Sequence, residues 1–101
     1  MSGVMSGPTR AVFESLVHQP FDVRPLQGEG QTRLELTAVE PLGGSQHPAS
    51  FRLLFRGERS SPLAQGLYTF EHAQLPREAI FIVPLDRGEA SITYEAVFNR
   101  G

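Results

Sequence analysis

Six short runs of strand-forming residues, separated by segments that contain proline, glycine or serine, constrain the fold of this chain more than any other feature. The runs cover residues 21–24, 32–40, 51–56, 66–71, 79–85 and 91–98, and no helical pattern separates them. Short strands joined by turns favour antiparallel neighbours, because a parallel crossover needs a dozen or more residues. The pattern predicts a mainly β fold, either a small antiparallel six-stranded barrel or a roll of two small sheets.

Three of these runs indicate which of their faces are buried. In the run 51–56, Phe51, Leu53 and Phe55 alternate with more polar neighbours, which predicts one buried and one outward face. In the run 32–40, Leu34, Leu36 and Ala38 alternate in the same way, with a slip in the pattern expected at Val39. The run 79–85 is apolar almost throughout and predicts a strand covered on both faces.

A single helix is predicted near the start of the chain. Between Pro8 and His18, Val12, Phe13, Leu16 and Val17 form a stripe with helical spacing, and Pro20 ends the element. A helix of about three turns is marginal alone and must pack on an apolar surface. We therefore expect it to lie against the apolar run 79–85. A turn is expected at Pro76.

The length and composition indicate one domain. An apolar share of 40% with 20% charged residues is typical of a globular protein, and 101 residues support one core. Residues 1–7 are polar and uncharged, so we expect a flexible N-terminus over residues 1–7 and a single β domain over residues 8–101. They also lack the pattern of a signal peptide, and no apolar run reaches the ~20 residues of a membrane helix. With no cysteine, the chain suits a cytoplasmic location, or a particle assembled in the cytoplasm.

Several chemistries find no support in the sequence. A net charge of −2 without a basic run argues against nucleic acid as a partner. The histidines at positions 18, 47 and 72 share no metal-ligand spacing, so no metal is expected. No phosphate-binding or dinucleotide loop and no nucleophile elbow is present, so no cofactor and no enzymatic activity are predicted.

Five residues remain as candidates for binding: Arg52, Leu54, Arg56, Glu71 and His72. Arg52, Leu54 and Arg56 share one face of the run 51–56, where the arginines suit an anionic partner. The simpler interpretation is that they pair with acids on neighbouring strands, such as Glu71 or Glu95. Leu54 is an apolar residue on a polar face, which indicates a surface covered by the helix or by another chain.

Glu71 and His72 are the closest approach to a catalytic pair. They are adjacent in the sequence, but neighbouring residues of a strand point to opposite faces, so their side chains are expected to diverge. We interpret them as a surface carboxylate and a loop histidine at the end of a strand.

Four segments occur in order along the chain: FRLLFRG at 51–57, QGLYTFEH at 65–72, IFIVPL at 80–85 and YEAVFN at 94–99. LVHQPFDV and LELTAVEPL precede them. Together these segments resemble an uncharacterised bacterial family of small proteins of about this length. The resemblance implies an all-β domain of unknown function, found near genes for phage-tail-collar-like proteins. It carries over no catalytic residues.

The first functional hypothesis is a non-catalytic protein-interaction or structural accessory module, of a phage-tail-like or fibre assembly. It rests on exposed strand edges and on outward apolar residues, Leu54 and Val97. A protein partner is expected, and self-association stays open. The alternative is a small-molecule-binding barrel with Arg56 and His72 near its mouth, which requires an internal cavity. An enzyme using Glu71 and His72 is the least favoured hypothesis.

Overall fold

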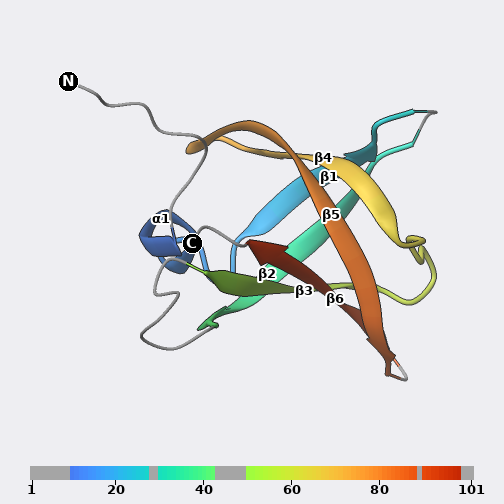
Figure 1. Ribbon diagram of the computed structural model, residues 1–101. Helices are drawn as coiled ribbons and strands as arrows, with labels where there is room; N and C mark the ends of the chain where they lie inside the picture. Colours follow the sequence, from blue (N-terminus) through green and yellow to red (C-terminus); the bar gives the residue numbers. More distant parts are fainter. Residues whose placement is uncertain (1–9, 28–29, 43–49, 89, 99–101) are drawn as a thin grey trace.

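The computed structural model describes residues 10–27, 30–42, 50–88 and 90–98, and the expected flexible segment 1–7 lies outside this part of the chain. One short helix precedes six strands (Figure 1). The elements are α1 (Arg10–Glu14), β1 (Pro20–Pro25), β2 (Thr32–Pro41), β3 (Phe51–Glu58), β4 (Gly66–His72), β5 (Leu75–Arg87) and β6 (Ser91–Phe98). α1, the sole helix in the described part, has five residues and cannot span a bilayer.

The strands form a closed barrel in the order β1-β2-β3-β6-β5-β4, with every neighbouring pair antiparallel. This confirms the predicted barrel and excludes the two-sheet alternative. The barrel consists of two three-stranded meanders, β1–β2–β3 and β4–β5–β6, which meet along two seams, β1–β4 and β3–β6. Closure leaves neither meander with the free edge strand that the sequence suggested as a docking edge.

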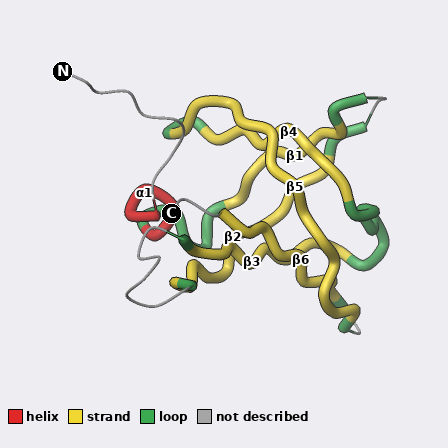
Figure 2. The backbone as a smooth tube through the Cα atoms, viewed as in Figure 1, coloured by secondary structure: helices red, strands yellow, loops and turns green. Residues whose placement is uncertain are grey.

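The helix covers one end of the barrel, which corrects the prediction that it packs on residues 79–85. The ring of Phe13 lies 6.0 Å from that of Phe51 and 5.5 Å from that of Phe98, at the ends of β3 and β6. Leu16, in the turn after the helix, is also buried. The helix is shorter than predicted because the chain turns from Ser15 to His18, where φ is +76°. Figure 2 shows α1 at one end and the β3–β4 loop at the other.

Strand β5 is buried on one face only, so the prediction of burial on both faces is wrong. Ile80 and Ile82 point into the core, whereas Phe81 and Leu85 are about half exposed. Because α1 packs on Phe51 and Phe98 and not on the outside of β5, only the inward face of this strand meets the core. The expected turn at Pro76 is also corrected. The turn is at residues 73–74, and Pro76 is part of the strand.

A bulge in β2 changes which residues of that strand face inward. The register shifts between Leu36 and Ala38, so that Ala38 pairs with Leu54 and Val39 with Leu53. Ala38 was predicted to continue the buried face, but the extra residue places Val39 there instead, packed against the core. The slip expected at Val39 is therefore real, and it begins two residues earlier.

Aromatic side chains fill the inside of the barrel. Phe55 and Phe70 lie 5.0 Å apart, Phe21 packs edge-on against Phe55, and all three are nearly inaccessible to solvent. Tyr94, completely buried, continues this packing toward the β3–β4 loop, where its hydroxyl accepts a hydrogen bond from the backbone N–H of Leu63. Packed rings occupy the space that a ligand-binding barrel would keep open.

Candidate functional site

Arg52 on β3 connects three strands on the outside of the barrel. Its guanidinium lies 2.6 Å from a carboxylate oxygen of Glu40 on β2 and 2.9 Å from one of Glu95 on β6. The hydrogen bonds that Arg52 donates to Glu95, and then those to Glu40, raise the pKa of Arg52 above its ordinary value. The expected pairing of Arg52 with Glu95 is confirmed, and its guanidinium is thereby engaged on both sides.

Arg56 is engaged in a second cross-strand pair. It donates to a carboxylate oxygen of Glu35, directly opposite on β2, over 2.6 Å. The imidazole Nδ1 of His18 lies 3.7 Å from the other oxygen of Glu35. The pKa of Glu35 is lowered, mainly by the hydrogen bond from Arg56 and less by His18. The pairing of Arg56 with an acid was predicted, although Glu35 was not the acid named.

Leu54 lies between these two arginines on the outward side of β3. It is half-buried, its backbone partner on β2 is Ala38, and its carbonyl accepts a hydrogen bond from the hydroxyl of Thr37. The helix does not cover it, because α1 packs on Phe51, whose side chain points to the opposite face of β3.

Glu71 and His72 diverge, as the sequence predicts. Glu71 is held on the outer surface, where one carboxylate oxygen accepts a hydrogen bond from Arg24 over 2.6 Å and forms an ion pair with Arg77 over 2.8 Å. The imidazole of His72 instead packs on the ring of Phe21, with centroids 5.0 Å apart. The two side chains take part in separate contacts. Arg56 lines an outer groove together with His18 and Glu35, and His72 does not line this groove.

A surface that the sequence did not reveal lies on the outside of β4 and β5. Leu67 and Phe81 are directly opposite each other in the β4–β5 ladder, and they are 48% and 47% exposed. Thr69 and Ala79 form the next outward pair. We call the outward residues of these strands, Leu67, Thr69, Glu71, Arg77, Ala79 and Phe81, the β4–β5 face.

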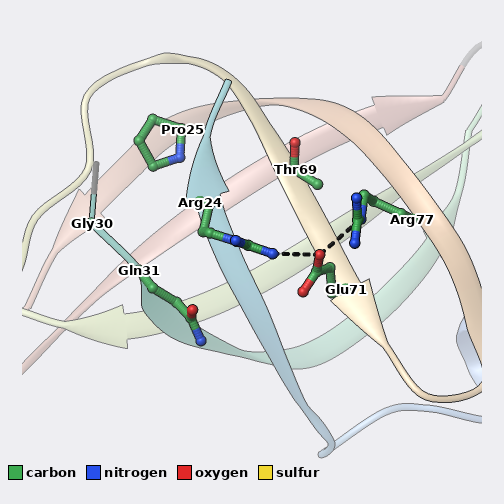
Figure 3. A pocket seen from close by; sticks show the side chains of 7 residues that line it. All are labelled: Arg24, Pro25, Gly30, Gln31, Thr69, Glu71 and Arg77. Carbon is green, nitrogen blue, oxygen red and sulfur yellow. Dashed lines mark hydrogen bonds and ion pairs between the residues drawn. The ribbon is translucent and has the colours of Figure 1, made fainter. Parts of the chain in front are cut away.

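A groove of about 580 Å³ lies at the charged end of the β4–β5 face. Figure 3 shows Arg24 and Arg77 reaching Glu71 from opposite sides, with Thr69 and Gln31 beside them. The arrangement offers guanidinium, amide and hydroxyl donors to an anion. Among the residues that the structure describes, no group of three or more histidines or acids is placed to hold a metal ion.

The sequence contained part of the signal for this face. Leu67, Thr69 and Glu71 alternate along one strand and Arg77, Ala79 and Phe81 along the next. Alternation tells which residues share a side of a strand, but the register that sets Leu67 opposite Phe81 depends on the turn at residues 73–74. Because the turn was expected at Pro76, the sequence could not predict that Leu67 lies opposite Phe81.

A comparison with protein families gives a match over residues 8–98 to the domain of unknown function DUF6916. The chain belongs to this family. The matched region includes every helix and strand of the structure, so the DUF6916 domain is the closed barrel together with α1. Membership in DUF6916 assigns no activity. Neither a curated protein nor a solved structure matches the chain.

Proposed function

We propose that this chain is a non-catalytic protein-interaction module that binds its partner through the β4–β5 face. The observation that carries the proposal is the pair Leu67 and Phe81, two large apolar side chains directly opposite each other and about half exposed. Exposed apolar residues are common singly, but neighbouring ones on one face favour a covered surface. Leu85 lies farther along the same side of β5 and is also half exposed.

The rest of the outer surface supports this choice of face. Ion pairs connect β1 with β2, β2 with β3, and β3 with β6, so charged pairs occupy much of the exterior outside the β4–β5 face. The filled interior and the separate contacts of Glu71 and His72 favour a surface function over ligand binding inside the barrel. The partner is a protein, since a flat apolar surface with a polar border is typical of protein interfaces.

We also place the module in a phage-tail-like or fibre assembly built in the cytoplasm. This setting is supported by the family resemblance of the segments between residues 16 and 99. It is also supported by the small size of the domain and by the ion pairs that cover much of its surface, as expected for an accessory part. Genes that neighbour this one are expected to encode tail or fibre components. Neighbours unrelated to such particles would remove this part of the proposal.

The binding face is tested by replacing Phe81 with serine in the full chain. Phe81→Ser removes the larger member of the apolar pair, and its matched control is Leu26→Ser, which replaces an apolar residue of similar exposure directly after β1. We expect Phe81→Ser to lose a host protein that the wild-type chain and Leu26→Ser both capture, with circular dichroism unchanged. Capture of the same proteins by both variants would show that the face is not the binding surface.

A further inference from the structure

The β4–β5 face changes from apolar to charged within a few residues. Leu67 and Phe81 form its apolar end, and the small side chains of Thr69 and Ala79 follow. Glu71 and Arg77 form its charged end, 2.8 Å apart. Because a strand rises about 3.3 Å per residue, the four residues from Leu67 to Glu71 separate the two ends by roughly 13 Å.

The charged end has more donors than its own carboxylate uses. Arg24 and Arg77 both contact the same oxygen of Glu71, and each guanidinium carries five N–H groups. Arg77 is turned toward solvent, with 70% of its side chain exposed. Arg24, Arg77 and Glu71 give this end a local charge of +1, to which the neighbouring ion pair of Asp22 and Arg33 adds nothing, whereas the whole chain carries −2 at pH 7. The face therefore attracts an anion at one end only.

The anion that fits best is a carboxylate. Glu71 already occupies part of the groove and shows that the two guanidiniums accept carboxylate geometry there. A polyanion such as a nucleic acid would meet a local charge of only +1 beside the acid Asp22, which lies opposite Glu71 in the β1–β4 ladder. A single carboxylate needs no larger positive field.

We propose that the β4–β5 face binds a polypeptide segment with an apolar side chain and, four residues away, a carboxylate. The apolar side chain packs on Leu67 and Phe81, and the carboxylate enters the groove and accepts hydrogen bonds from Arg24 and Arg77. Thr69 and Ala79 leave room for the extended backbone between the two anchors. This inference rests on the proposed function and defines the chemistry of the partner.

Three synthetic peptides test the two anchors separately. They are acetyl-Leu-Ser-Thr-Ser-Glu-amide, the same peptide with Gln in place of Glu, and the same peptide with Ser in place of Leu. Each is titrated into the isotope-labelled full chain and followed by NMR. We expect the first peptide to shift the Nε–H signals of Arg24 and Arg77 and the backbone signals of Leu67 and Phe81. Loss of either anchor is expected to weaken binding roughly tenfold.

Variants of the arginines show whether the groove is the carboxylate anchor. Arg77→Gln removes the charge of the side chain and keeps a polar amide at its end, and Arg59→Gln, in the β3–β4 loop, is the matched control. Arg77→Gln is expected to weaken the Glu peptide roughly tenfold and to leave the Gln peptide unchanged, whereas Arg59→Gln changes neither. Equal binding of the Glu and Gln peptides, or no binding at all, overturns the inference.

The outcome also separates this inference from the proposed function. If Phe81→Ser loses its captured protein while Arg77→Gln binds the Glu peptide as the wild type does, the interaction face stands and the carboxylate anchor is wrong. If Phe81→Ser and Leu26→Ser capture the same proteins, the proposed function fails, and with it the inference that depends on it.

Discussion

At the scale of single residues, Gly57 shows how little free space the barrel contains. It is buried in β3, and a Cβ atom at this position would lie 2.5 Å from a methyl carbon of Leu34 and 3.3 Å from the ring of Tyr94. Gly57→Ala is therefore expected to lower the free energy of unfolding by about 1–3 kcal/mol through overpacking. Urea denaturation measures it, with Glu58→Ala on the same strand as the control. An unchanged midpoint for Gly57→Ala would show that Leu34 relaxes without cost.

The ion pair of Glu35 and Arg56 predicts a dependence of stability on pH. The pKa of Glu35 in the folded protein is lowered from the ordinary value of 4.5, chiefly by Arg56, so the ionised carboxylate stabilises the fold above that value. This contribution is lost as the pH falls through the lowered pKa. The Tm of Glu35→Gln is therefore expected below that of the wild type at pH 7, with the difference shrinking below about pH 4.5. The same substitution made in an Arg56→Gln background should lack most of this pH dependence.

Among the secondary-structure elements, the short helix α1 stabilises the fold mainly through one side chain. Phe13 of α1 is 1% exposed and packs at the barrel end against the stacked rings of Phe51 and Phe98. Phe13→Ala should lower the free energy of unfolding by about 3–5 kcal/mol, a large part of the stability of a small domain. Val12→Ala, on the outer side of the helix, is expected to change it by less than about 0.5 kcal/mol. Similar midpoints for both variants in guanidinium chloride would mean that α1 is not part of the core.

The sequence patterns predicted where these elements lie along the chain better than they predicted which elements contact each other. All six strands overlap the predicted runs, because alternation reports a local property of the chain. The position of α1 depends on which apolar surface is left uncovered after the strands have paired. The apolar run 79–85 was the surface on which the sequence predicted the helix to pack. The surface on which it does pack, at Phe51 and Phe98, exists only once β3 and β6 are neighbours.

At the scale of the whole molecule, the two seams that close the barrel join distant parts of the chain. Arg24 and Glu71 across β1–β4 are 47 residues apart, and Arg52 and Glu95 across β3–β6 are 43 residues apart. Forming such pairs costs conformational entropy, because a long loop must close before the contacts can stabilise the fold. Refolding is expected on the millisecond to second timescale of all-β domains, measured by stopped-flow circular dichroism. Complete refolding within microseconds would contradict the dominance of these seams.

The same seams limited what could be foreseen about the candidate site. The interpretation that the outward arginines of β3 pair with acids such as Glu71 or Glu95 is confirmed for Arg52 and Glu95, which meet because β3 and β6 are neighbours. The pairing of Glu71 with Arg24 required knowledge that β1 and β4 close the barrel. The β4–β5 face likewise follows from strand register, which the sequence leaves undetermined.

The hydrogen bonds that hold the β3–β4 loop determine what optical spectroscopy reports about this protein. The chain has two tyrosines and no tryptophan, and both tyrosines hydrogen-bond this loop: Tyr94 accepts from Leu63, and Tyr68 donates to the carbonyl of Ala64. Near-ultraviolet absorption and intrinsic fluorescence therefore come chiefly from one end of the barrel. The end closed by the helix carries phenylalanines and is almost silent to these methods. An optical melting curve of this protein follows the release of the loop, and the detachment of the helix needs a different probe, such as hydrogen exchange.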